Sequence, residues 1–338
     1  MKKFLFVLFL AVFFGGTTAS ADEVKTKKAF KKNIRSDEIR CVGPVNMSHG
    51  LVIPKGKYQL CLQYNYAHKD DLYKGRDKKT GNYVGKYDQV DHVANLIFKL
   101  GLFENFETRL IVPFINRELK RKSGNPPENT NITDNSGLGD IKVIGRYSLL
   151  SERKGDWLSM AIGGGVKLPT GDTDKKNVAP FSTNYEYMGP GFQLGTGSWD
   201  PIFELGITKF SGPSRYDFHT MYTIGTKGSH GSRKGDTFKC DLGYGYALNK
   251  HFDVELELNS VYQKAHRHDN KSTVDTGGHT IYLTPGMHWK INRELHLSMG
   301  VPIVIYRDIN GKSRTPDWKS QYGLSEDYRF VTKIVYNF

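Results

Sequence analysis

The feature that most constrains the fold is an alternation of apolar and polar side chains with a period of two residues. In segment 252–262, FDVELELNSVY, apolar and acidic residues alternate as far as Leu258. An α-helix repeats every 3.6 residues and would place Glu255 and Glu257 inside the apolar stripe. The alternation therefore predicts a β-strand with one apolar and one polar face.

The alternation recurs about twelve times from Lys57 to the last residue. Clear examples occupy 238–248, 252–262, 281–291, 295–305 and 328–338, and weaker ones begin near Lys57, Asp91, Phe106, Asp140, Trp157, Asp200 and Tyr216. Each segment has about the 10 residues that a tilted transmembrane strand requires.

The connections between these segments alternate in length. The short connections are 103–105, 151–156, 211–215, 249–251 and 292–294, and the long ones are 68–88, 118–137, 170–198, 227–236, 264–278 and 307–327. Bacterial outer-membrane barrels have short periplasmic turns and long outer loops. We therefore predict an all-β chain in which residues 57–338 form one transmembrane antiparallel β-barrel of about 12 strands.

The first 21 residues indicate the compartment. Lys2 and Lys3 precede the apolar run 4–14, and the sequence Ala19-Ser20-Ala21 follows. This order is typical of a secretory signal peptide, and the apolar run is shorter than the roughly 20 residues of a membrane-spanning helix. We predict that a Gram-negative bacterium exports the chain through its inner membrane, cleaves residues 1–21 and inserts the mature protein in its outer membrane.

Residues 22–56 precede the barrel and are basic. The cations are Lys25, Lys27, Lys28, Lys31, Lys32 and Arg35. We interpret the segment as a solvated periplasmic tail, with a partial plug inside the barrel as the alternative.

The charge balance limits the partners. The chain has 48 basic and 35 acidic residues, and removal of Lys2 and Lys3 leaves 46 against 35, a net charge of +11. In an exported protein this surplus favours anionic lipopolysaccharide or an anionic solute over nucleic acid. We expect contacts with outer-membrane lipids and lipopolysaccharide, passage of small-molecule solutes, and neither a cofactor nor a metal site.

Three scattered cysteines are too few for a disulfide framework. Cys41 and Cys61 could form a bridge in an oxidising compartment, which would leave Cys240 unpaired.

If the apolar faces contact lipid, the opposite faces line the lumen. The charged candidates for that lining are Arg109, Asp140, Lys142, Arg146, Glu204, Lys239, Asp241, Asp253, Glu255, Glu257, Lys290, Arg329 and Lys333. This mixture of signs suits either a paired network that stabilises the interior or a polar constriction that selects solutes. The acidic row of segment 252–262 requires facing cations, for which Lys239 and Lys290 are the candidates.

The final strand, YRFVTKIVYNF, carries aromatic residues at both ends and ends on Phe338. It resembles the last strand by which bacterial barrels are recognised for assembly. We predict that Tyr336 and Phe338 form that signal for the barrel-assembly machinery.

Three blocks in the middle of the chain carry a family resemblance: residues 137–142 (GLGDIK), 163–172 (GGGVKLPTGD) and 190–198 (PGFQLGTGS). In this order they resemble the outer-membrane proteins grouped under the MetA pathway of phenol degradation. The resemblance covers most of the mature chain, and the second block is its most specific part. It implies a barrel that carries small, often aromatic or apolar, compounds, and it transfers no catalytic or ligand residues.

These observations predict a passive channel for small solutes rather than an enzyme. The alternative is a structural or surface-binding barrel with little conductance. An outer-membrane lipid hydrolase is less favoured, because the Gly-Ser-His-Gly-Ser sequence at 228–232 lies in a loop that offers no oriented base.

Overall fold

The computed structural model describes residues 43–78, 87–123, 129–176, 186–269, 271–272, 276–309 and 323–338. The predicted signal peptide, the basic cluster up to Arg35 and Cys41, the proposed partner of Cys61, lie outside these residues. In the described part of the chain, Cys61 and Cys240 are unpaired.

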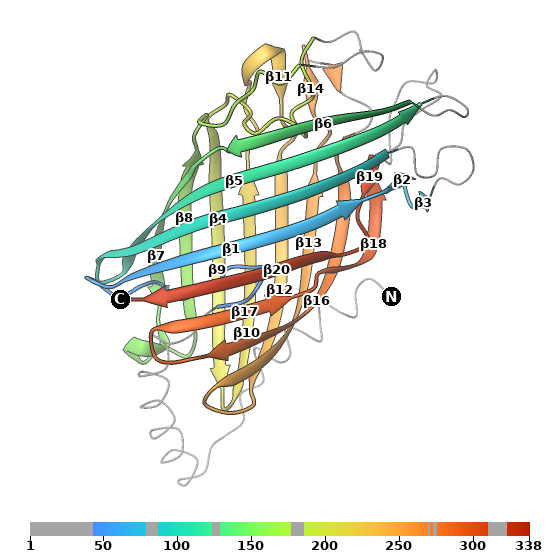
Figure 1. Ribbon diagram of the computed structural model, residues 1–338. Coiled ribbons are helices and arrows are strands. Elements are labelled where there is room, and N and C mark those ends of the chain that lie inside the picture. The colour runs from blue at the N-terminus through green and yellow to red at the C-terminus, as the bar shows by residue number, and fades with distance from the viewer. Residues whose placement is uncertain are drawn as a thin grey trace.

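The protein is a closed antiparallel β-barrel of twelve strands (Figure 1). Two of the twelve, β6 with β7 and β17 with β18, are each interrupted in the middle. In chain order the strands are β1 (Tyr58–Lys69), β4 (Tyr87–Phe103), β5 (Phe106–Ser123), β6 (Asn129–Leu138) with β7 (Lys142–Leu150), β8 (Ser159–Lys167), β9 (Asp200–Ser211), β10 (Ser214–Thr223), β12 (Thr237–Ala247), β13 (Phe252–Gln263), β16 (Gly278–Lys290), β17 (Leu295–Gly300) with β18 (Ile303–Ile309), and β20 (Arg329–Asn337).

The barrel closes where its first and last strands pair. The register of β1 with β20 runs from Gln59 opposite Asn337 to Ala67 opposite Arg329. At the same end Phe338 donates its backbone N–H to the Tyr58 carbonyl at 2.9 Å and stacks on the Tyr58 ring, with centroids 4.5 Å apart. This pairing leaves neither the first nor the last strand as a free edge in the lipid.

The predicted strand count and the predicted alternation of links are confirmed, with one correction. Residues 118–137, predicted as a long polar link, are largely strand, since β5 continues to Ser123 and pairs with β6. Figure 1 shows β6 lying beside the second half of β5. Because the side chains of this hairpin are mostly polar on both faces, the alternation that reveals the other strands is missing there.

Small elements lie at the end of the barrel that carries the long connections, here called the loop end. One sheet joins β11 (Ser232–Arg233), β14 (Arg267–His268) and β15 (Lys271–Ser272), and another joins β2 (Asp71–Lys74), β3 (Asp77–Lys78) and β19 (Gly323–Ser325). The 3-10 helix η3 (Ser229–Gly231) lies in a long connection, whereas η2 (Glu152–Lys154) lies in a short one at the opposite, short-turn end. In the described ranges, no helix has the length and apolar character needed to span a membrane.

Exposure separates the two faces of each strand. On β13, Phe252, Val254 and Leu256 are 37–47% exposed, whereas Glu255 is 7% and Glu257 0% exposed. The apolar set therefore points outward and the acidic set inward, the reverse of a water-soluble protein. Exposed aromatic residues gather near the short-turn end: Phe103, Tyr147, Trp157, Tyr246, Phe252, Trp289 and Phe338. Such rings concentrate at a membrane–water interface.

Candidate functional site in the barrel lumen

The candidate functional site is the lumen, into which the polar strand faces point. Of the predicted lining residues, seven are buried (Arg109, Asp140, Arg146, Glu204, Asp241, Glu255 and Glu257) and six are half-buried (Lys142, Lys239, Asp253, Lys290, Arg329 and Lys333).

A stretch of chain before the first strand lies within the barrel. Residues 43–57, here called the lumen segment, run along the inner wall to the start of β1. Gly206 of β9 permits the close approach, because a Cβ there would overlap the carbonyl oxygen of His49. Gly50 in turn lies so close to β8 that a Cβ on Gly50 would overlap the carbonyl oxygen of Ser159.

The wall holds the lumen segment through its backbone. Glu255 accepts a hydrogen bond from the Val45 N–H at 2.8 Å, and Glu257 accepts one from the Asn46 N–H at 3.0 Å. Lys333 donates to the carbonyl of Pro44 at 2.7 Å. Charged groups that bond to backbone satisfy polar atoms which would otherwise be stranded inside the barrel.

The most buried cluster centres on Arg146 of β7, whose side chain is 0% exposed. Its guanidinium lies 3.0 Å from Glu107 and also contacts Glu204. It donates to the carbonyl of Leu51 at 2.8 Å and to that of His49. Arg146 therefore links the walls of β5 and β9 to the lumen segment.

Arg109 of β5 completes this cluster. Its Nε donates to Glu107 at 2.6 Å, and its Nη1 donates to the Ser48 hydroxyl at 2.8 Å. Glu107 also accepts the Ile53 N–H at 2.6 Å. Two carboxylates and two guanidiniums thus neutralise one another in a single buried cluster. Any one of these charges would be costly to bury without its partners.

A second cluster surrounds Glu255 on β13. Arg215 lies 3.1 Å from Glu255 and 2.6 Å from Asp217, and His288 lies 2.7 Å from Glu255. The neighbouring acid Asp253 pairs with Lys290 at 2.7 Å, as the sequence predicts. Lys239, the other cation predicted for this row, forms no ion pair with the acidic row in the described strands.

Nearer the loop end, Lys167 of β8 bridges two carboxylates, at 2.6 Å to Asp140 and 2.9 Å to Asp200. Asp140 also accepts the backbone N–H groups of Gly171 and Thr196, at 3.1 and 3.0 Å. The conspicuous sequence blocks 163–172 and 190–198 therefore meet at one carboxylate, which ties Gly171 and Thr196 to the wall.

Sequence reasoning found several members of these clusters and missed others. It missed Glu107, Arg215 and His219, and it did not anticipate the lumen segment's contacts. His219 of β10 lies 3.0 Å from Asp241 and 3.7 Å from Glu204. Glu107 had a detectable signal, since it stands two residues before Arg109 and therefore on the same strand face. The contacts of the lumen segment had none, because residues 43–57 show no alternation.

Among the groups outside the strands, His49 and Lys234 have perturbed pKa values. Burial lowers the pKa of His49 well below its usual value, and nearby cations, first Lys99 and then Arg146, lower it further. The imidazole Nδ1 accepts the Leu51 N–H at 3.1 Å, which requires an unprotonated Nδ1. Near the loop end, burial and then Arg117 and Lys167 lower the pKa of Lys234 to about 8.

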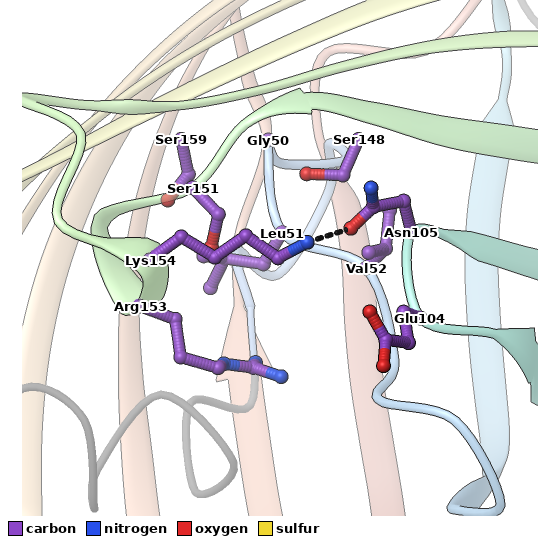
Figure 2. Close-up of a pocket in the computed structure, with 10 residues that line it drawn as sticks. All are labelled: Gly50, Leu51, Val52, Glu104, Asn105, Ser148, Ser151, Arg153, Lys154 and Ser159. Carbon is purple, nitrogen blue, oxygen red and sulfur yellow. Dashed lines mark hydrogen bonds between the residues drawn. The ribbon is translucent and has the colours of Figure 1, made fainter.

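Two open pockets flank the lumen segment at the short-turn end. The first lies between residues 50–52 and the turn that carries η2 (Figure 2). From this turn Arg153 and Lys154 extend over the pocket, and Lys154 donates to Asn105. The second shares Leu51, Val52 and Arg153 with the first.

The connection that contains the Gly-Ser-His-Gly-Ser sequence has one feature that the sequence did not predict. Ser232 lies 3.2 Å from Nδ1 of His268, whose Nε2 lies 3.4 Å from Asp269. The Asp269 side chain is 74% exposed, whereas the carboxylate that orients a catalytic histidine is buried. This geometry gives the hydrolase alternative little support. Among the described residues, no group of three or more potential ligands could hold a metal ion.

Comparison with known proteins places the chain in a family. The family model described as "Putative MetA-pathway of phenol degradation" matches residues 97–315, more than half of the chain. The chain belongs to this family. The match confirms the resemblance that the three sequence blocks carry. No curated protein sequence matches this chain.

Several solved structures are similar to this chain, and one of them has a TM-score above 0.5 and shares its fold. An outer membrane channel from Pseudomonas putida F1 matches with a TM-score of 0.63 and 15% identity, covering 88% of this chain and 100% of that one. A mutant of the TodX monoaromatic hydrocarbon channel matches with a TM-score of 0.45 and 8% identity, over 88% and 93% of the two chains. A FadL homologue from Pseudomonas aeruginosa matches with a TM-score of 0.41 and 10% identity, covering 84% of this chain and 90% of that one.

Proposed function

We propose that this protein is a passive outer-membrane channel for small solutes, including aromatic or apolar compounds. The observation that carries the proposal is a closed barrel with an apolar outside and a charged inside, in which open pockets remain beside the lumen segment. The similar barrel from Pseudomonas putida is itself described as an outer membrane channel. No chemical step is needed for this function, so we propose a transport protein rather than an enzyme.

The orientation follows from the loops. The short turns and the C-terminus share one end of the barrel, which we assign to the periplasm, and the long connections face the outside. We infer that the chain is exported with residues 1–21 as a cleaved signal peptide. Lipids would contact the exposed apolar belt, and lipopolysaccharide would contact the loop end.

We propose that the lumen segment is a partial plug. Its backbone is bonded to charged side chains of β5, β7, β13 and β20. These bonds fix the segment across the part of the lumen near the short-turn end, where it narrows the path to the two flanking pockets. For the described part of that segment, residues 43–56, the plug alternative is therefore favoured over a solvated tail.

Liposome swelling tests the channel directly. The mature protein and a variant that lacks residues 43–53 would be reconstituted and exposed to neutral sugars and small aromatic solutes. We expect uptake above that of protein-free liposomes for the mature protein, and a severalfold faster uptake for the deletion variant because the constriction is gone.

The runner-up, a structural or surface-binding barrel, predicts a different result. Such a barrel would give no uptake above lipid alone in either form. Heat-modifiable migration on gels would show that both forms are folded, so a negative result would count against the channel and not against the preparation.

A further inference from the structure

A segment of the long connection between β8 and β9 folds against the inside of the barrel at the loop end. This segment, residues 186–199, is here called the loop strap. Arg117 of β5 donates hydrogen bonds to the strap carbonyls of Gly191 and Gln193, each at 2.9 Å. Arg117 is an even number of residues from the lumen-facing Arg109 and therefore stands on the same face of β5. The strap thus lies on the lumen side of this strand.

The loop strap also reaches the opposite side of the barrel. A Cβ on Gly191 would lie 3.9 Å from Nε2 of His266, so these two residues lie side by side. His266 follows the end of β13 directly, and its Nδ1 accepts the backbone N–H of Gly235, just before β12, at 3.0 Å. Between β5 and β13 the wall contains β7, β8, β9, β10 and β12 in one direction and β4, β1, β20, β17 and β16 in the other. The strap therefore crosses the lumen between opposite strands.

The strap carries apolar side chains into this crossing. Met188 and Phe192 of the strap pack with Leu119 of β5, and all three residues are 6–7% exposed. Leu324 of β19 packs against them from the connection that leads to β20. Asn135 of β6 holds the cluster in place by donating to the Phe192 carbonyl at 3.1 Å. An apolar cluster thus stands at the loop end of a lumen whose other clusters, described above, are charged.

Further hydrogen bonds fix the strap at both ends of this cluster. The side-chain amide of Gln193 donates to the Met188 carbonyl at 3.0 Å. Asp140 accepts the Thr196 N–H at 3.0 Å, and the backbone N–H of Ser229 donates to the Thr196 carbonyl at 3.2 Å. These bonds satisfy backbone groups that would otherwise lack partners inside the barrel. The strap is therefore held as a part of the lumen and not as a surface loop.

We infer that the loop strap is a second constriction, in series with the lumen segment, and that its apolar cluster makes the constriction favour neutral apolar solutes over ions and sugars. Water leaves a narrow passage lined by apolar side chains, so solutes that must keep their hydration are held back there. An apolar molecule loses no hydration that it needs and gains contacts with the same side chains. The inference rests on the proposed channel function and assigns its selectivity to Leu119, Met188, Phe192 and Leu324.

Arabinose and toluene are the probes, and Phe192→Ser in the full mature chain is the main variant. Liposome swelling measures the entry of arabinose, and labelled toluene is followed into cells that carry the protein in their outer membrane. We expect arabinose entry to rise about twofold, because two constrictions in series share the resistance and one of them is opened. Toluene uptake should fall, because a hydroxyl replaces part of the apolar surface that the solute contacts.

Three further variants control this test. Phe192→Leu keeps an apolar side chain and should leave both rates near those of the mature protein. Leu324→Ser changes the cluster from a different element and should shift both rates as Phe192→Ser does, which keeps the test available if Phe192→Ser fails to fold. Phe114→Ser is the matched control, since Phe114 is 52% exposed on the outward face of β5 and should leave both rates unchanged. Heat-modifiable migration on gels shows which variants are folded.

The directions of the two rates separate a selective constriction from a steric one. If arabinose and toluene both enter faster in Phe192→Ser and Leu324→Ser, the strap restricts solutes by size alone and the inference is wrong. If neither rate changes in the folded variants, the strap does not restrict the path, and the inference is wrong while the channel stands. Absence of arabinose entry from both the mature protein and the variant without residues 43–53 would overturn the channel itself.

Discussion

At the scale of single residues, the interior depends on groups that each satisfy several partners. Arg146 reaches Glu107, Glu204 and two carbonyls of the lumen segment. Buried ion pairs add little net stability compared with apolar packing, but removing one member leaves the others charged and unpaired. The arrangement therefore tolerates few substitutions at its centre.

Arg146→Met should destabilise the barrel by about 3–5 kcal/mol, because Glu107 and Glu204 lose a shared buried partner. The expected readout is a lower temperature for the heat-induced gel shift of the folded barrel. Arg146→Lys keeps the charge and should lose less stability. Arg153→Met at the mouth of the pockets is the control for loss of an arginine. If Arg146→Met unfolds at the temperature of the unmodified protein, the cluster does not stabilise the fold.

At the scale of elements, β20 closes the barrel and also ends the chain. Tyr336 and Phe338 contact each other, with ring centroids 4.5 Å apart, and both are exposed on the outer surface. An outward-facing aromatic pair at the end of the last strand is accessible before the barrel closes, as an assembly signal requires. Their role as that signal remains a prediction.

Phe338→Ala should reduce the amount of folded protein in outer membranes severalfold, while the same variant refolds in detergent nearly as well as the unmodified protein. In detergent we expect the free energy of unfolding to fall by about 1 kcal/mol. This is the contribution of an aromatic pair in addition to that of its buried surface area. Tyr328→Ala, an exposed aromatic at the other end of the same strand face, is the control. Equal losses in cells and in detergent would show that Phe338 serves closure and not recognition.

At the scale of the whole molecule, the barrel and the lumen segment form one unit in which docking depends on protonation. His49 faces four cations, namely Lys99, Arg109, Arg146 and Arg215, while Glu107 and Glu204 nearby are engaged by the arginines. Burial first, and then these cations, hold the pKa of His49 below its undocked value of about 6.5. A lowered pKa means that docking favours the neutral ring, so docking is fully stable above pH 6.5 and weakens as the pH falls.

Conductance should therefore rise as the pH is lowered from 7.5 to 5, because protonated His49 weakens the docking of the lumen segment. Single-channel recording across this range measures the effect. His49→Gln keeps a side chain of similar size and removes the titration, so its conductance should vary less with pH. A pH dependence that persists unchanged in His49→Gln would assign it to other groups, such as His219 or His288 on the wall.

The sequence by itself determined the barrel, its twelve strands and the direction of each face, because a two-residue alternation is a local property that lipid outside and water inside impose on every strand. It also predicted Lys239 and Lys290 as cations facing the acidic row of β13, of which Lys290 pairs with Asp253. Only the tertiary structure decided which charges meet across the lumen and where the lumen segment lies. Val45 and Glu255 are 210 residues apart, and no periodicity in the chain connects them. Their contact exists because closure of the wall brings distant strands around one narrow space, into which the preceding segment folds.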